Sequence, residues 1–268
     1  IRILVDNVLL DCLGNSIDGD DNVWYGIEAE RFSSTNTNIT IRNCTITDWG
    51  SRAVSFTFAD NNVLDNLNLD SNVDTGIYLL DSDNNNITNS DITNTGGEGI
   101  YLDSSDNNII SDSNVNNNNN GIYIYTSSTN TISTSYANDN NIGIYIYSSS
   151  NNTILNSSIA DNNNKGIRIH SSQDNSIYDN IINNTDDTFF TGSFYYNAWN
   201  TSYQLSPSII NGTYMGGNYW AKPDGTGYSE NCTDINADRI CDNSYTINTS
   251  NIDYLPLAAA DLVLPSGQ

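Results

Sequence analysis

Basic residues are scarce in this sequence, and the shortage excludes several classes of protein. Its 268 residues include 8 Lys and Arg, 32 Asp and Glu, and only 1 His and 1 Met. A nucleic-acid-binding protein needs a basic face to displace counterions from phosphate, so no nucleic-acid partner is expected. The net charge of -24 would also repel an anionic membrane surface. Because no apolar run approaches the ~18 residues of a membrane span, no such span is expected either.

Apolar and charged residues are both below their usual shares. The apolar fraction is 37% and the charged fraction 15%, against about 45–50% and about 25% in ordinary domains. Asn, Ser and Thr make up the difference, and Asn alone is about one residue in six. The composition indicates either a polar low-complexity chain or a repeat fold that stacks asparagines.

Three apolar registers repeat along the chain, each in steps of 22 or 23 residues. The first consists of Ile41, Leu64, Ile87, Ile110, Ile132, Ile154 and Ile177. The second lies five residues later, at Ile46, Leu69, Ile92, Val115, Ala137, Ile159 and Ile182. The third follows a glycine in all but its first member, at Val54, Ile77, Ile100, Ile122, Ile144 and Ile167. A disordered chain has no reason to keep three registers in step, so the pattern predicts a repeat fold.

Each repeat contains short runs that alternate between apolar and polar or aromatic residues, such as 121–125 and 143–147. A period of two is typical of strands, and the Asn, Ser and Gly residues between the runs favour turns. Three short strands per repeat predict an all-β solenoid of about 7–8 coils with 22–23-residue repeats.

The abundance of asparagine follows from this fold. Two residues before the first register stand Asn62, Asn85, Asn108, Asn130, Asn152 and Asn175. Stacked turn asparagines pass amide hydrogen bonds from coil to coil, and Asn tolerates the left-handed backbone of a sharp turn. We therefore expect these asparagines to be the stacked, left-handed turn residues.

The composition changes near residue 186 and divides the chain into three parts. Residues 1–185 are predicted to form the parallel β-helix, and 186–257 an aromatic-rich C-terminal cap with an acidic loop. The aromatic cluster at 189–203 also suits a socket for the next subunit. Residues 258–268 are expected to be a tail.

The acidic loop has the ligand types that calcium prefers. Carboxylate or amide oxygens recur at alternating positions, and one backbone carbonyl adds to them. The candidate ligands are Asp234, Asn236, Asp238, Ile240 and Asp242. A disulfide between Cys232 and Cys241 is the alternative means of holding the loop.

The remaining cysteines, Cys12 and Cys44, would pair across adjacent coils if Leu9 stacks near Ile41. Two disulfides indicate an oxidising compartment. Ten Asn-x-Ser/Thr sequons favour a secreted glycoprotein. They are Asn38, Asn43, Asn86, Asn151, Asn156, Asn183, Asn200, Asn211, Asn231 and Asn248.

A stripe of tyrosines is the most distinctive surface feature. Alternation turns these residues outward on one face: Tyr78, Tyr101, Tyr123 and Tyr145, beside Tyr125 and Tyr147. Arg168 and His170 continue the same two columns one coil further on. The stripe could stabilise the sheet, contact another subunit or bind sugar rings. Acidic residues at the turns alternate freely with Asn, which is typical of solubilising turns rather than a catalytic pair, so catalysis is not favoured.

The Gly-Ile-Tyr-Leu and Asn-Asn-x-Ile repeats resemble the NosD-type right-handed parallel β-helix, which is related to the carbohydrate-binding and sugar-hydrolase (CASH) repeat. The resemblance covers about residues 1–257, and the acidic loop is similar to an Asp-x-Asp-x-Asp-Gly stretch of that family, with Arg239 in place of the Gly. The Gly217-Asn218-Tyr219-Trp220 ending is similar to that of surface proteins of methanogenic archaea. The resemblance implies the fold more strongly than a function.

We interpret the chain as an extracellular structural protein of a cell envelope, in a surface layer, sheath or filament. It would self-assemble head to tail through its solenoid ends and outer faces. The alternative is a polysaccharide-binding or polysaccharide-cleaving β-helix whose partners are cell-surface glycans; a cleaving enzyme would be a lyase or a glycoside hydrolase. A role in copper handling, which the family name implies, is disfavoured by the single His and Met.

Overall fold

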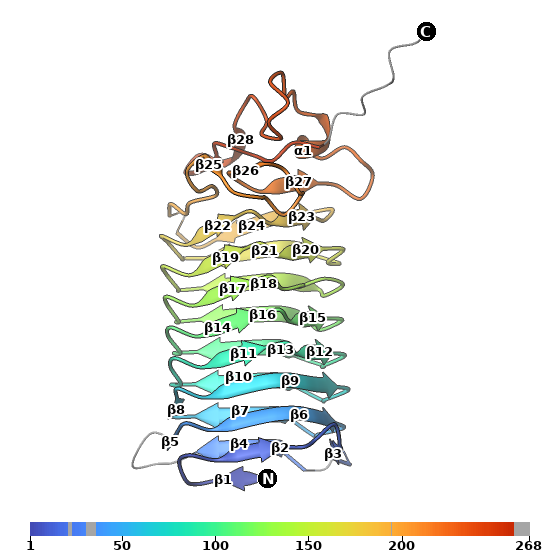
Figure 1. Cartoon of the computed structure of the whole chain (residues 1–268), viewed down its shortest axis with the longest axis vertical. Helices are drawn as coiled ribbons and strands as arrows, with labels where there is room; N and C mark the ends of the chain where they lie inside the picture. The colour runs from blue at the N-terminus through green and yellow to red at the C-terminus, as the bar shows by residue number, and fades with distance from the viewer. Residues whose placement is uncertain (21–22, 31–35, 194, 260–268) are drawn as a thin grey trace.

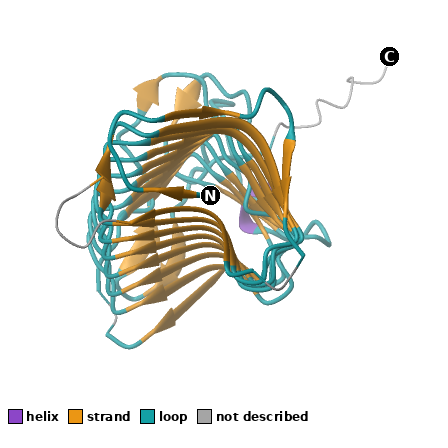
Figure 2. Ribbon diagram, turned by 90° about the horizontal axis from the view of Figure 1, so that it is seen from below, coloured by secondary structure: helices purple, strands orange, loops and turns teal. Residues whose placement is uncertain are grey.

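The computed structural model describes residues 1–20, 23–30, 36–193 and 195–259. In this part the chain winds into a rod of stacked coils, and the strands of successive coils pair in parallel (Figure 1). Seen along the axis, the coils superimpose on one another (Figure 2). The predicted all-β solenoid is confirmed, with a single short helix, α1 (Tyr228–Asn231), among the described residues. The right-handed winding stays a prediction.

Two long sheets form the walls of the rod. The nine-stranded sheet, here called sheet A, contains β1 (Arg2–Ile3), β4 (Tyr25–Glu30), β7 (Arg52–Thr57), β10 (Thr75–Leu80), β13 (Glu98–Asp103), β16 (Asn120–Tyr125), β18 (Ile142–Tyr147), β21 (Lys165–His170) and β24 (Thr188–Thr191). The eleven-stranded sheet, here called sheet B, contains β2 (Leu9–Asp11), β3 (Ser16–Asp18), β6 (Thr40–Thr47), β9 (Val63–Asp70), β11 (Asn86–Thr88), β12 (Asp91–Thr93), β14 (Ile109–Ser111), β15 (Asn114–Asn116), β17 (Thr131–Ser133), β19 (Thr153–Leu155) and β22 (Ser176–Tyr178).

Smaller sheets complete the coils and the C-terminal end. They contain β20 (Ser158–Ala160), β23 (Ile181–Asn183) and β27 (Tyr219–Ala221); β5 (Asn36–Thr37) and β8 (Ala59–Asp60); β25 (Gln204–Leu205) and β26 (Tyr214–Met215); and β28 (Tyr245–Asn248) and β29 (Asn251–Asp253). Parallel pairing continues beyond residue 185, because β24 pairs with β21 and β27 pairs with β23.

The three predicted apolar registers form the core. Ile122 lies opposite Ile144 in sheet A, and Ile132 lies opposite Ile154 in sheet B. All four side chains are 0 or 1% exposed. A glycine precedes the sheet A register because a Cβ at Gly143 would approach a backbone oxygen of the next coil to 2.7 Å. The repeat therefore specifies both the core and the close spacing of the coils.

Buried asparagines stack along one corner of the coil, as expected. The column consists of Asn62, Asn85, Asn108, Asn130, Asn152, Asn175 and Asn197. Each backbone N–H donates to the side-chain oxygen of the asparagine in the next coil, at 2.8–3.1 Å. We call such a column a polar ladder.

The expectation that these asparagines are themselves left-handed is wrong. The left-handed residue is the one before, for example Asn84 or Asn151, with φ of 58° and 57°. These neighbours are exposed, whereas the ladder asparagines are buried. The two demands, a left-handed turn and a stacked amide, therefore fall on consecutive residues.

Three further polar ladders were not predicted. Their members are Ser82, Ser105, Ser127, Ser149 and Ser172; Ser90, Ser113, Ser135, Ser157, Asn180 and Asn218; and Asn118, Asn140, Asn162 and Asn184. The side-chain oxygen of each member accepts a backbone N–H from the preceding coil. The buried backbone groups at the corners of the coil therefore have hydrogen-bond partners.

The predicted disulfide Cys12–Cys44 is present, but the register behind the prediction is off by one residue. Leu10, not Leu9, lies opposite Ile41. Two residues separate Ile41 from Cys44 in β6, but only one separates Leu10 from Cys12 in the first coil. The additional residue is Asn43, which has a left-handed φ of 55°.

The C-terminal segment closes the rod by ending three ladders. Asp187, Asn251 and Asp253 accept the backbone N–H of Asn184, Asn197 and Asn218, at 2.9, 3.0 and 2.8 Å. Trp199 and Trp220 fill the space beneath, at 0 and 1% exposed. These contacts cover the last coil, as a cap requires. Most of the expected tail, 260–268, lies outside the described residues.

Candidate functional site

Tyrosines form a continuous column on the outer face of sheet A. Tyr101, Tyr123 and Tyr145 stack with ring centroids 4.8 and 4.7 Å apart, and Tyr78 meets Tyr101 edge-on at 5.0 Å. We call these four residues the tyrosine column. It spans three coil spacings, about 14 Å. Tyr101, Tyr123 and Tyr145 are half-buried, whereas Tyr78 is buried at 6% exposed.

An arginine covers each end of the tyrosine column. The Arg52 guanidinium lies 3.6 Å from the centroid of Tyr78, and that of Arg168 lies 4.5 Å from Tyr145. The ring faces inside the column contact one another, and the terminal faces contact cations. A sugar ring therefore meets ring edges and hydroxyls here rather than open ring faces.

A second, shorter column lies beside the first. Tyr125 and Tyr147 are 5.2 Å apart, and His170 stacks on Tyr147 at 4.2 Å. The Nδ1 atom of His170 is 2.9 Å from Thr191 Oγ1, which fixes the ring. Unlike the tyrosine column, this second column has no Lys or Arg stacked over its tyrosine rings within the described residues.

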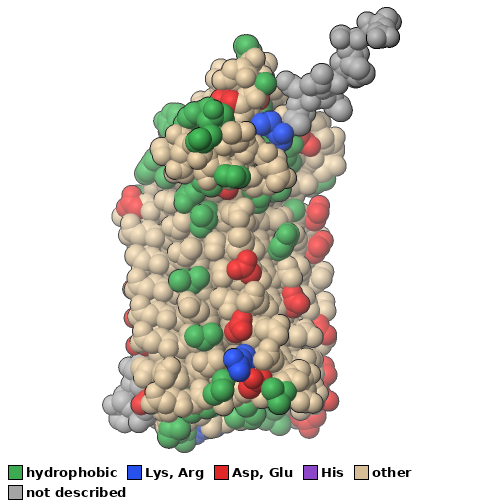
Figure 3. All heavy atoms as spheres, in the orientation of Figure 1, with side chains coloured by type: hydrophobic (Ala, Val, Ile, Leu, Met, Phe, Trp, Pro, Cys, Tyr) green, Lys and Arg blue, Asp and Glu red, His purple; other side chains and the backbone are tan. Residues whose placement is uncertain are grey.

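The C-terminal half of this face contains no carboxylate. The strands β16, β18, β21 and β24 have no Asp or Glu, although the chain has 32. Their basic residues are Lys165 and Arg168, beside His170. We call the outward side of these four strands the acid-free face. Elsewhere acids are common, as the view in Figure 3 illustrates with many acidic and few basic side chains.

The tyrosine hydroxyls remain protonated at neutral pH. Burial raises the pKa of Tyr78 to about 12, and burial also raises the pKa values of Tyr101, Tyr123 and Tyr145. The Tyr78 hydroxyl donates to Asp103 at 3.1 Å. The column therefore presents neutral hydroxyls, which donate and accept hydrogen bonds as sugar hydroxyls do.

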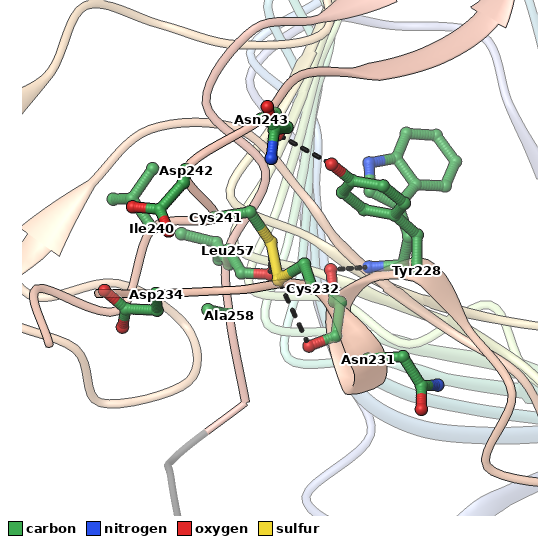
Figure 4. Close-up of a disulfide and its surroundings, with 12 residues drawn as sticks. Tyr228, Asn231, Cys232, Asp234, Ile240, Cys241, Asp242, Asn243, Leu257 and Ala258 are labelled. Atoms are coloured by element: carbon green, nitrogen blue, oxygen red, sulfur yellow. Dashed lines mark hydrogen bonds between the residues drawn. A yellow bond between two sulfur atoms is a disulfide. The ribbon is translucent and has the colours of Figure 1, made fainter. Parts of the chain in front are cut away.

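The acidic loop is held by a disulfide and by its own backbone. Cys232 and Cys241 are joined, as the alternative interpretation expected (Figure 4). Asp234 accepts the backbone N–H groups of Asp238 and Arg239, at 3.1 and 2.9 Å. Arg239 takes a left-handed φ of 72°, so the turn forms without the family's glycine.

Two of the candidate calcium ligands accept the same backbone N–H, because Asp234 Oδ1 and Asn236 Oδ1 lie 3.1 and 3.3 Å from Asp238 N. Within the described residues no group of three or more His, Cys, Asp or Glu side chains is close enough to hold a metal ion. The carboxylates of Asp234 and Asp242 point away from the disulfide (Figure 4), and both accept backbone N–H groups. Calcium binding by this loop stays a prediction.

The adjacent carboxylates Asp186 and Asp187 turn in different directions. Asp186 is exposed and contacts Lys165, whereas Asp187 is buried and pairs with Lys222 at 2.8 Å. Asp179 and Asp253 are buried elsewhere, and burial raises their pKa values to about 6 and about 7. These four carboxylates have separate partners, whereas Asp60 and Asp83 lie together: the backbone N–H of Asp83 donates to Asp60 at 2.7 Å, and burial and the charge of Asp83 raise the pKa of Asp60.

A concave site lies on a third side of the rod. It has a volume of about 320 Å³ and is lined by Tyr136, Asn156, Ser158 and Ile209, among others. Tyr136 is 51% exposed and makes no ring contact within the described residues.

None of the ten sequon asparagines is buried.

The family assignment follows from the sequence. The family described as "Periplasmic copper-binding protein (NosD)" matches residues 13–225. The chain belongs to the NosD family. The periplasmic description and the two disulfides agree with an oxidising compartment outside the cytoplasm. Among the described residues, no helix has the length and apolar character to cross a membrane. No curated protein sequence matches the chain.

Copper, which the NosD description implies, does not fit the side chains of this member. Copper sites use thiolate, thioether or imidazole ligands. All four cysteines are in disulfides, and the only His and Met contact Thr191 and Gln204. The donor set is therefore too small and too dispersed, and no function is derived from copper.

Solved structures that share the fold include an alginate epimerase and an enzymatically active tailspike domain. The periplasmic alginate epimerase AlgG aligns with a TM-score of 0.55 and 17% identity, over 74% of this chain and 46% of its own. The enzymatically active domain of tailspike protein 2 from Bacteriophage CBA120 aligns with a TM-score of 0.56 and 14% identity, over 70% and 32%. The chain thus spans less than half of either structure, and at this identity the likeness establishes the fold alone.

Proposed function

We propose that this protein is an extracytoplasmic polysaccharide-binding β-helix that holds a glycan along the outer face of sheet A. The acid-free face is the observation that carries the proposal. It places aromatic edges, neutral hydroxyls and basic groups together over several coils, on a chain that is otherwise strongly acidic. These are the groups that recognise sugar hydroxyls and apolar sugar edges.

The regular spacing of the coils suits a linear polymer. Hydroxyl-bearing rings recur every 4.7–5.0 Å along the tyrosine column. A glycan lying parallel to the rod would meet a similar group at each coil, so many weak contacts add together. The fold shared with an alginate epimerase supports this alternative over our first interpretation, a structural envelope protein.

A binding measurement with Tyr147→Ala tests the proposal. Tyr147 lies in the centre of the acid-free face, between Tyr125 and His170. Against oligosaccharides from bacterial and archaeal cell surfaces, we expect the variant to lose about tenfold in affinity by calorimetry. Tyr136→Ala, on another side of the rod, is the matched control and should bind as the wild type does. Equal binding by wild type and Tyr147→Ala would contradict the proposal.

Self-association remains a second candidate because of one patch. At the N-terminal end, Leu9, Leu13 and Trp24 are 60, 80 and 71% exposed. Apolar exposure of this kind favours a protein contact. The other end is closed by the cap, so contacts through the N-terminal ends would give pairs rather than head-to-tail filaments. Electron micrographs of purified protein would distinguish pairs from filaments.

A further inference from the structure

The basic side chains of this protein fall into two groups. The structure describes seven of the eight, since Arg31 lies outside the described residues. Arg2, Arg42, Lys165 and Lys222 contact carboxylates. Arg239 donates instead to two backbone carbonyls at 3.2 Å. Arg52 and Arg168 have no carboxylate within 4.0 Å in the described part of the chain.

Arg168 has the least satisfied guanidinium. It lies between the rings of Tyr145 and Phe189, at 4.5 and 5.9 Å from their centroids. Its Nε atom is buried and has no hydrogen-bond partner among the described residues. Arg52 shares the orphaned Nε but donates from Nη1 to Ser55 at 3.4 Å. In a chain with 32 carboxylates, an arginine without a counter-ion is unexpected.

The stacked position prepares Arg168 to bind an anion. Aromatic rings hold the plane of the guanidinium, and its remaining N–H donors form the fork that matches a carboxylate or a sulfate. The four strands of the acid-free face supply no competing carboxylate, and Asp186, just before β24, contacts Lys165 rather than Arg168. Lys165 lies on the same strand as Arg168, three residues away, but its charge is paired with Asp186.

We infer that the glycan bound by this face is acidic, and that Arg168 binds one of its carboxylate or sulfate groups. This inference rests on the proposed function. The site on the protein is centred on Arg168 and flanked by Tyr145, Tyr147 and Lys165. The ligand class is a polysaccharide with uronate or sulfated units.

The large negative charge of the protein does not prevent this contact. Charges more than about 8 Å apart are mostly screened at physiological ionic strength. The acids on other sides of the rod therefore act weakly at Arg168, whereas a direct contact with the guanidinium is little screened. Asp186, two residues before β24, contacts Lys165.

The test compares an acidic oligosaccharide with its neutral counterpart. The probes are a polyuronate oligosaccharide, the same oligosaccharide after chemical reduction of its carboxyl groups, and a sulfated neutral oligosaccharide. We expect the wild-type protein to bind at least one acidic probe about tenfold or more tightly than the reduced one. Which acidic probe binds distinguishes a uronate from a sulfate.

Substitution of Arg168 assigns the preference to this site. Arg168→Gln should abolish the preference for the acidic probe, and Arg168→Lys should keep part of it. Arg42→Gln, which removes an exposed arginine paired with Asp11 on sheet B, is the matched control and should keep all of it. Thermal unfolding of each variant checks that the fold is intact.

The outcomes separate the inference from the proposed function. Equal binding of acidic and reduced probes would overturn the acidic ligand class but leave glycan binding in place. A preference that survives in Arg168→Gln would overturn the site. Failure to bind any glycan would overturn the proposed function and this inference with it.

Discussion

The solenoid continues its buried polar ladders with neutral side chains, whereas the cap ends two of them with carboxylates. In the four buried ladders of the solenoid the members are neutral amides or hydroxyls, as at Asn152 and Ser127, whereas a half-buried column of Asp60, Asp83 and Asp106 also accepts backbone N–H groups from coil to coil. At the cap, two of the three described terminators are the carboxylates Asp187 and Asp253. A repeated position has neighbours about 4.8 Å away on both sides, so stacked carboxylates would repel one another. A terminal position has one neighbour, and a carboxylate is tolerated there.

This difference gives the two regions different sensitivities. The four buried ladders of the solenoid contain no titratable group, although burial and the charge of Asp83 raise the pKa of the half-buried Asp60. The cap contains Asp253, fully buried, whose pKa is raised to about 7 by burial. We therefore expect a change in pH to alter the stability of the cap more than that of the coils.

The largest expected effect comes from placing a carboxylate inside a ladder. In Asn152→Asp, an oxygen would replace the Nδ2 that donates to Ser127 O and Asn175 Oδ1, both at 3.0 Å. A buried, unpaired charge should lower the free energy of unfolding by about 3–5 kcal/mol at pH 8, measured by denaturant titration. The loss should shrink as pH falls and the new carboxyl protonates.

The neighbouring residue supplies the control. Asn151 is exposed and left-handed, a conformation that Asp also adopts, so Asn151→Asp should change stability by no more than about 0.5 kcal/mol. Similar losses in the two variants would refute the distinction between ladder and turn positions.

A smaller effect is expected from Asp253. Its folded pKa lies above its unfolded value of about 3.8, so the folded state binds more protons in between, and stability falls as pH rises. Between pH 6 and 8 this group should lower the free energy of unfolding by about 1.4 kcal/mol. Asp179, with a pKa of about 6, adds less in this window.

Asp253→Asn should remove most of that pH dependence, because an amide oxygen still accepts the N–H of Asn218 but does not titrate. Denaturant titrations of both proteins at pH 6 and pH 8 measure the slope. An unchanged slope in the variant would show that the cap is not the pH-sensitive region.

The smallest expected effect is on the outside of the solenoid. Tyr123→Ala removes the stacking contacts with Tyr101 and Tyr145 and should cost about 1 kcal/mol in thermal unfolding. Tyr136→Ala, whose ring makes no such contact, should cost less. An equal or larger loss for Tyr136→Ala would contradict a specific contribution of ring stacking to stability.

The repeated features could be predicted from the sequence because each recurs at the same position in several coils. Ile122 and its equivalents recur every 22 or 23 residues, and so do Tyr123 and the ladder asparagines. The serine ladders, such as that of Ser127, follow the same period and were accessible to the same reasoning.

The cap could not be predicted in this way because its residues occur once. Nothing in the local sequence of Asp253 reveals that it ends a ladder begun far away at Ser90. The unpaired state of Arg168 was equally hidden, although its outward direction was predicted, because a missing counter-ion is a property of three-dimensional surroundings.

The most direct test of the central claim is a crystal structure of the protein with a saturating acidic oligosaccharide. We expect the sugar chain on the outer face of β16, β18 and β21, with an acidic group within hydrogen-bond distance of Arg168. Sugar bound instead at the concave site beside Tyr136, or on the cap near Pro207, would contradict the account.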